Sequence, residues 1–218
     1  PLVAQFDTAL ARLQADATLS RGDRVGALIE RVDLARLGQP NDVTQPTLPP
    51  ALVQEVRELS ARMDREISDG YERQAVIPAV AHLQAQAGLW ADSDALLKAN
   101  LAKSHSPYYL MSQLGSNARK LGKKDEALRW YAQAFGKSEG PATRLQWGAS
   151  YFGALVDLAP DDAPRIERVA SQLLAGAARD KGAFHERSAR ALQRVGRKMA
   201  SWAADGKHAA AMKRLQAQ

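Results

Sequence analysis

The residue types that most often perform enzyme chemistry form no recognisable arrangement in this sequence. Its histidines are His82, His105, His185 and His208, and none lies three or four residues from another, as two metal ligands on one helix would. The chain has no cysteine, which removes disulfides, thiolate metal ligands and cysteine nucleophiles. It also lacks a glycine-rich phosphate loop and a nucleophile elbow. We therefore expect no catalytic residue, no cofactor and no metal site, and hence no enzyme activity in this chain.

A row of arginines is the clearest cluster of charge. Arg187, Arg190, Arg194 and Arg197 follow one another at steps of three and four, which places them on one side of a helix predicted over residues 184–204. Such a row can bind phosphates or other anions, but it is also the ordinary solvated face of an amphipathic helix. Few aromatic residues interrupt the row to stack on bases. Nucleic-acid or anion binding through this basic helix is therefore the alternative function rather than the leading one.

The rest of the composition indicates a helical protein with an uneven charge. Of its 218 residues, 45% are hydrophobic and only 6% are aromatic, and alanine and leucine dominate, which favours helices over sheets. The formal charge is +6, and residues 183–218 hold 8 Lys or Arg against 2 Asp or Glu, so the basic excess gathers at the C-terminal end. No apolar run reaches the roughly 20 residues that span a bilayer, so we expect no membrane span.

The elements that must position these residues are predicted to be helical hairpins. In residues 108–141, Leu114-Gly115, Ala127, Tyr131, Ala134 and Pro141 follow one another at the spacing of two packed helices, with a break at Gly122. This pattern resembles the tetratricopeptide repeat, whose period is about 34 residues. Residues 76–107 and 141–178 look like looser copies of it. Farther upstream, an apolar face of Leu2, Val3, Phe6, Leu10 and Leu13 predicts a first helix paired with a second over residues 24–37.

We therefore predict an all-α fold without a sheet, in which antiparallel hairpins stack as an irregular tetratricopeptide-like right-handed superhelix. Residues 1–218 would form one helical-repeat domain. The proline-rich segment 38–50 could mark a boundary inside it, because four of the ten prolines fall there and no regular element persists through them.

In tetratricopeptide arrays the first helix of each pair lines the concave surface, and this predicts a groove for a protein or peptide partner. Its candidate residues are Tyr109, Ser112, Gln113, Ser116, Arg119, Arg144 and Gln146. The Lys and Asn residues with which some members of the family clamp a terminal carboxylate are absent from the matching places, two of which hold Val80 and Leu145.

Three strings carry a second resemblance: residues 98–111 (KANLAKSHSPYYLM), 140–149 (GPATRLQWGA) and 184–188 (FHERS). They are similar to the helical C-terminal region of proteobacterial thioredoxin-like, disulfide-isomerase-related proteins, in which a thioredoxin fold with a Cys-x-x-Cys motif precedes the helices. The resemblance implies a domain for protein interaction or substrate presentation, attached to an upstream redox domain whose substrate could be the partner. It favours a bacterial periplasmic location, with the cytoplasm left open. No redox role falls on any residue here, because the chain has no cysteine.

Overall fold

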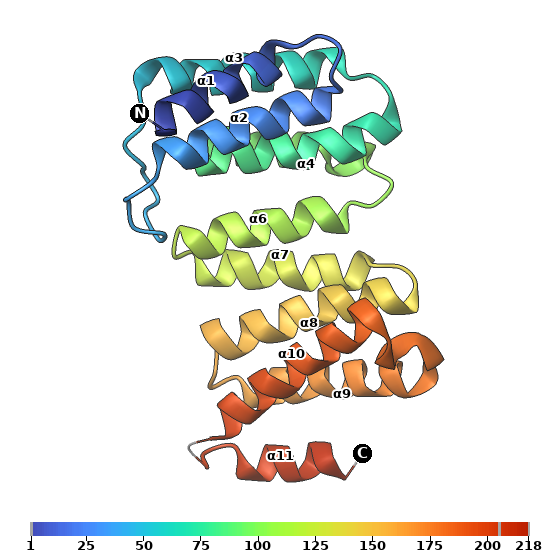
Figure 1. Cartoon of the computed structure of the whole chain (residues 1–218). Coiled ribbons are helices and arrows are strands. Elements are labelled where there is room, and N and C mark those ends of the chain that lie inside the picture. The colour runs from blue at the N-terminus through green and yellow to red at the C-terminus, as the bar shows by residue number, and fades with distance from the viewer. Residues whose placement is uncertain (1, 205, 218) are drawn as a thin grey trace. The chain divides into compact units, whose positions relative to one another are not determined.

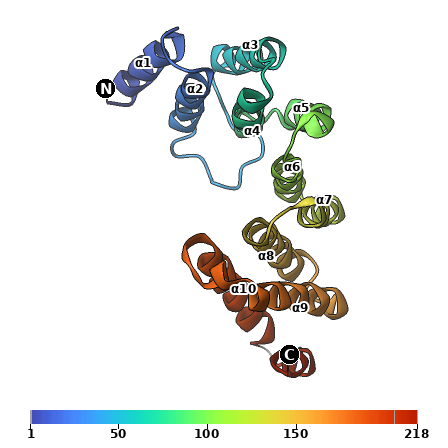
Figure 2. The same cartoon turned by 90° about the vertical axis from the view of Figure 1, so that its right-hand side faces the viewer.

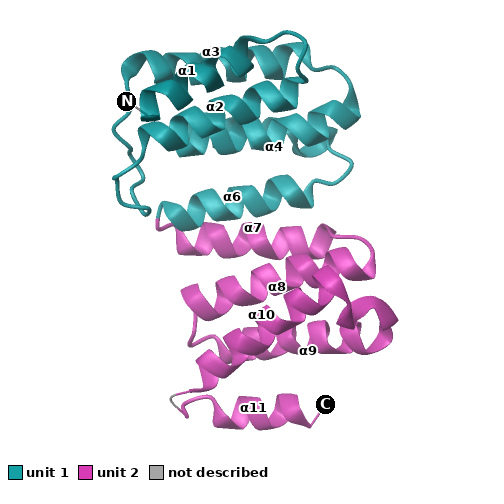
Figure 3. Ribbon diagram, in the orientation of Figure 1, with its two compact units in different colours: residues 1–121 teal, residues 122–218 magenta. Residues whose placement is uncertain are grey.

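The computed structural model describes residues 2–204 and 206–217, which fold into eleven α-helices and two short 3-10 helices without a strand (Figure 1). Helices account for 79% of the chain. The all-α prediction is therefore confirmed. The contacts divide the chain into two compact units, residues 1–121 and residues 122–218, called unit 1 and unit 2 below (Figure 3).

Unit 1 is built around its fourth helix. Its elements are α1 (Leu2–Ala15), α2 (Arg21–Ala35), α3 (Pro50–Glu66), α4 (Gly70–Gln86), α5 (Trp90–Asn100), η1 (Leu101–Lys103) and α6 (Tyr108–Lys120). Helix α4 packs against α2, α3, α5 and α6, and Figure 2 shows α2, α3 and α5 around it. Ile77, Val80 and Leu83 are almost completely buried there. Pro78 lies inside α4, and the helix continues through it from Gly70 to Gln86.

A buried polar chain joins α4, α5 and α6. The hydroxyl of Ser93 donates a hydrogen bond to the Ala81 carbonyl at 2.8 Å. The amide of Asn117 donates to Ser93 Oγ at 3.0 Å and to Asp94 Oδ1 at 2.9 Å. Ser93 and Asn117 are both buried, so these bonds satisfy groups that would otherwise be costly to remove from water.

The proline-rich segment 38–50, except Pro50, which begins α3, is a loop held against the turn between α4 and α5. Trp90 Nε1 donates to the Thr44 carbonyl at 2.6 Å. Pro46 lies so close to Gly88 that a β-carbon there would be 3.0 Å from Pro46 Cδ, and Gly88 has a φ of +80°, which favours glycine. The contacts of this loop therefore lie within unit 1.

Helix α1 differs from the expected packing. It pairs with α2 as predicted, but Leu2, Val3, Phe6 and Leu13 face solvent, and none of its residues is buried. A polar cluster faces the neighbouring helices instead. Arg31 donates to Asp7 Oδ1 at 2.9 Å, to Gln14 Oε1 at 2.6 Å and to Glu55 Oε2 at 2.5 Å.

Unit 2 is built around its second helix. Its elements are α7 (Lys124–Lys137), α8 (Pro141–Leu158), α9 (Ala163–Arg179), η2 (Lys181–Phe184), α10 (Glu186–Ala203) and α11 (Ala209–Gln216). Helix α8 packs against α7, α9 and α10, and α11 packs against α9. The side chain of Asp162 caps α9 by accepting a hydrogen bond from the Arg165 amide, a role for which Asp is favoured at the position before a helix.

Side-chain contacts fasten α10 to α8 and to the turn that follows α8. Val195 and Trp202 are buried, and Trp202 Nε1 donates to the Pro160 carbonyl at 2.8 Å. Lys198 forms an ion pair with Asp157 of α8 at 2.5 Å. One face of α10 is thereby committed to packing, which leaves the arginine face available to solvent.

Candidate functional site

The seven predicted groove residues fall into two sets. Tyr109, Ser112, Gln113, Ser116 and Arg119 share one face of α6 in unit 1, whereas Arg144 and Gln146 belong to α8 in unit 2. The contacts therefore assign the two sets to different units, and a groove formed by all seven stays a prediction.

Several polar groups on the α6 face already have partners inside the protein. Gln113 Nε2 donates to the Pro78 carbonyl at 3.1 Å, and Ser116 Oγ donates to the Ser112 carbonyl at 3.2 Å. Tyr109 is 43% exposed, and its ring centroid lies 5.1 Å from that of Tyr108. The exposed part of this face is centred on Tyr109, Ser116 and Arg119.

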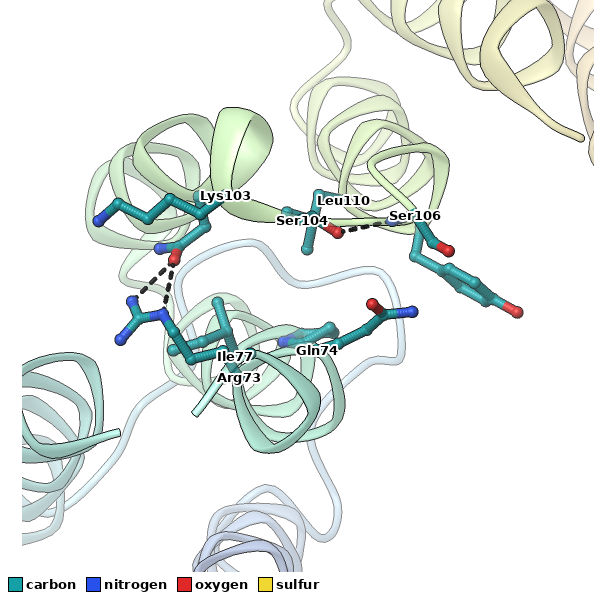
Figure 4. Close-up of a pocket in the computed structure, with 11 residues that line it drawn as sticks. Arg73, Gln74, Ile77, Lys103, Ser104, Ser106 and Leu110 are labelled. Atoms are coloured by element: carbon teal, nitrogen blue, oxygen red, sulfur yellow. Dashed lines mark hydrogen bonds between the residues drawn. The ribbon is translucent and has the colours of Figure 1, made fainter. Parts of the chain in front are cut away.

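Tyr109 also lines a small pocket in unit 1, which Figure 4 shows in close-up. Its volume of about 20 Å³ is room for about one water molecule. Arg73 at its wall donates to the carbonyls of Asp64 and Ile67 and to Asn100 Oδ1, and it forms an ion pair with Asp64. Because so many of its donors are satisfied, Arg73 ties the end of α3 to α4 and α5 and is poorly placed to hold a ligand.

A larger pocket lies in unit 2, between the end of α7, the start of α8, the end of α9 and η2. Its volume is about 350 Å³, within the range of small-ligand pockets. The following residues line it: Phe135, Gly140, Pro141, Arg144, Leu145, Gln172, Leu173, Gly176, Ala177, Arg179, Asp180 and Ala183. Of these, Phe135, Leu145, Leu173, Ala177 and Ala183 are buried, so the floor is apolar and firmly packed. We call it the unit 2 pocket.

Two guanidinium groups stand on the wall of the unit 2 pocket. The Arg144 guanidinium lies 5.1 Å from the centre of the Phe135 ring, and Arg144 also donates to the Ser138 carbonyl at 3.1 Å. Arg179 is exposed in the last turn of α9. Asp180 is the only carboxylate among the lining residues, and it accepts a hydrogen bond from the Gly182 amide at 2.9 Å. Positive charge therefore prevails around the apolar floor.

A third pocket, between α1, α2 and α3, is less suited to a ligand. Its volume is about 520 Å³, but Leu52 is the one buried side chain among the described residues that line it. The rest belong largely to the exposed side of α1 and to Arg31 with its carboxylate partners.

The arginine row on α10 is exposed as the sequence predicted. Arg187, Arg190, Arg194 and Arg197 lie on the solvent side of the helix, while Ala191 and Val195 are buried. Among the described residues, none of these four arginines has an ion pair within 4 Å, whereas the neighbouring Lys198 is paired with Asp157. The row thus differs from a face neutralised by interleaved acids.

No set of three or more metal-ligating side chains gathers within residues 2–204 and 206–217. In the same part of the chain, no helix has the length and apolar content to cross a membrane.

Reasoning from the sequence missed most of the unit 2 pocket, with Arg144 as the exception. Leu173, Gly176 and Ala177 belong to α9, and Ala183 comes from η2, so tertiary packing brings these residues to the N-terminal end of α8. A signal was present in the run of small residues 175–178, which leaves space on the surface of α9. Sequence spacing alone could not show that this space faces Phe135.

Comparison of the chain with protein-family models and with curated proteins finds no match. Two solved structures share its fold. A Podosopora anserina protein described as a kinesin light chain with nearly identical TPR-like repeats is 15% identical, with 91% of this chain and 96% of that chain covered and a TM-score of 0.53. BtubC (BKLC) from P. vanneervenii is 17% identical, with 98% and 87% covered and a TM-score of 0.52. The chain therefore has a TPR-like helical-repeat fold, and at such low identity the likeness concerns the fold alone.

Proposed function

We propose that this chain is a non-catalytic helical-repeat domain that binds a segment of another protein. The unit 2 pocket carries the proposal. Its floor combines five buried apolar residues, and its wall carries a few polar groups that can fix the orientation of a bound segment. A volume of about 350 Å³ suits one or two large side chains of a peptide better than it suits a folded surface.

The position of the pocket supports a binding role. It lies where four elements end or begin, so a peptide can reach both its apolar floor and backbone groups at helix termini.

The test is selection from a library of random 12-residue peptides displayed on phage, using the full chain as bait. Gly176→Trp would place a large side chain at the pocket, and it should fold because a β-carbon at Gly176 meets nothing within 4 Å. Peptides selected on the wild-type chain should bind this variant at least tenfold more weakly.

Gly196→Trp provides the matched control. Gly196 is also an exposed helical glycine whose β-carbon would meet nothing within 4 Å, but it lies on α10 outside the pocket lining. Selected peptides should bind it as they bind the wild type. Failure to select any peptide, or equal binding by both tryptophan variants and the wild type, would overturn the proposed function.

A second candidate function is polyanion binding through the exposed arginine row on α10. The observation that favours it is the absence of ion pairs for these four arginines among the described residues. Double-stranded DNA labelled with a fluorophore tests it by anisotropy. If the arginines contact phosphates, the affinity for DNA should fall steeply as the salt concentration rises. It should also be lower for the double variant Arg190→Gln, Arg194→Gln than for the wild type. An affinity that is absent or independent of salt eliminates this candidate.

Attachment to an upstream thioredoxin-like domain remains part of the proposal and would make the bound protein a substrate of that domain. Its support is the resemblance of residues 98–111, 140–149 and 184–188. The gene sequence upstream of residue 1 tests it directly. If no thioredoxin-like segment with Cys-x-x-Cys is encoded there, the redox association fails while the peptide-binding proposal still stands.

A further inference from the structure

We infer that the unit 2 pocket recognises an acidic peptide segment, in which a large apolar side chain enters the pocket and neighbouring Asp or Glu residues contact Arg144 and Arg179. This inference rests on the proposed function and adds the chemistry of the partner. It follows from three observations: the apolar floor, the charges on the wall and the charge of the surrounding unit.

The floor selects an apolar side chain. Phe135, Leu145 and Leu173 are at most 7% exposed, so they are held in place by the packing of α7, α8 and α9. A polar side chain that entered this pocket would lose its hydrogen bonds to water against these groups, whereas an apolar one would gain by leaving water.

The wall selects carboxylates next to that side chain. Arg144 is positioned by its contact with the Phe135 ring and by one hydrogen bond to the Ser138 carbonyl. A guanidinium has five N–H donors in a planar fork, so most of those on Arg144 remain for a carboxylate. Arg179 is exposed, and within the described part of the chain its side chain makes no hydrogen bond or ion pair. Asp180, the one carboxylate of the lining, is already engaged with the Gly182 amide.

The unit as a whole strengthens this preference. Residues 122–218 hold 17 Lys or Arg against 10 Asp or Glu, a net charge of +7, whereas residues 1–121 hold 13 against 14, or −1. Helix α10 begins at Glu186, three residues after Ala183 of the pocket, and carries the exposed arginine row. A positive field of this kind attracts acidic segments and repels basic ones, and salt screens it.

The phage library proposed above tests the inference through the composition of the peptides it yields. We call a peptide pocket-dependent if it binds the wild-type chain but no longer binds the Gly176→Trp variant. Such peptides should be enriched in Asp and Glu around a Leu, Ile, Met or aromatic residue. One such peptide, synthesised with a fluorophore, is then measured by anisotropy at about 50 and about 300 mM NaCl. Its affinity should fall several-fold at the higher salt, because contacts with exposed arginines are screened.

Arg179→Gln isolates the charge from the packing. Arg179 is exposed, so its substitution should leave the fold intact and weaken the acidic peptide about threefold to fivefold at low salt, which is the range of an exposed ion pair. Arg168→Gln is the matched control: Arg168 is exposed on the same helix but does not line the pocket, and its loss should change the affinity little. Substituting Gln for the acidic residues of the peptide should abolish the difference between Arg179→Gln and the wild type.

The outcomes separate the two proposals. The acidic partner is ruled out if the pocket-dependent peptides are neutral or basic. It is also ruled out if their affinity changes neither with salt nor in the Arg179→Gln variant. In both cases the proposal of peptide binding still stands. Failure to select pocket-dependent peptides overturns both. A second copy of this chain as the occupant would appear in sedimentation as an oligomer that Gly176→Trp dissociates, and that result would also overturn the inference.

Discussion

Gly148 of α8 lies directly against Leu173 of α9. A β-carbon at position 148 would come within 2.4 Å of Leu173 Cδ2 and within 2.8 Å of Phe135 Cε2, closer than real side chains approach. Since Leu173 and Phe135 both line the unit 2 pocket, this close approach of helix backbone to side chains shapes the pocket floor. The glycine is required for close packing and not for an unusual backbone angle.

Replacing Gly148 by alanine should therefore destabilise the protein although alanine favours helices. Overpacking of this kind costs about 1–3 kcal/mol. Gly153→Ala, in the same helix, is the control: nothing lies within 4 Å of its β-carbon, so it should stabilise the helix by about 0.5–1 kcal/mol. Urea denaturation followed by circular dichroism measures both. Equal effects of the two substitutions would contradict the packing argument.

Arg73 should be the most sensitive arginine of unit 1. Its guanidinium joins Asp64, Ile67 and Asn100, and its side chain is only 15% exposed. Arg73→Ala leaves these acceptors without a donor and should lower the unfolding free energy by about 2–4 kcal/mol. Arg65→Ala should change it by less than about 0.5 kcal/mol, because that side chain is 72% exposed and lies 3.9 Å from Glu66. A similar loss in both variants would show that the network around Arg73 contributes little.

Large apolar residues on the exposed face of α1 should contribute little to stability. Phe6 is 54% exposed, so Phe6→Gln should change the unfolding free energy by less than about 1 kcal/mol. Leu28 of α2 is completely buried, and Leu28→Ala should cost about 2–5 kcal/mol. Thermal and urea unfolding compare the two. A loss above about 2 kcal/mol for Phe6→Gln would mean that this face is covered in solution.

The ion pair between Arg214 of α11 and Glu167 of α9 should give a pH dependence. Two hydrogen bonds from Arg214, at 2.8 and 2.6 Å, hold the pKa of Glu167 below its usual range. A lowered carboxyl pKa means that the stabilisation is complete above the usual pKa of Glu, near 4.5, and is lost as pH falls through the lower folded value. The effect is small because both groups lie close to solvent.

Carbon-detected NMR titration of the Glu167 carboxyl tests this pair. In Arg214→Gln the pKa of Glu167 should rise towards its usual value, whereas Lys213→Gln, one residue away, should leave it unchanged. An unchanged pKa in Arg214→Gln would rule out the pair as the cause of the shift.

Much of the fold could be predicted from the sequence because helices depend on local spacing. The positions Ala127, Tyr131 and Ala134 predicted a helix with one buried face, and all three are buried in α7. The break at Gly122 was equally predictable, since its φ of +72° is one that glycine adopts without strain. Helix α1 was predicted less well. Its apolar stripe indicated a helix, but local spacing does not determine whether another element covers that stripe.

The candidate site depended more on tertiary structure. By itself the sequence determined the helices, the exposed arginine row on α10 and the lack of cysteine chemistry, because residue type and a period of 3.6 are local. Only the tertiary structure decided that Phe135, Leu145, Leu173 and Ala183 share one pocket with Arg144 and Arg179. The physical reason is that these residues come from four separate elements, and their meeting depends on how closely α8 and α9 approach at Gly148.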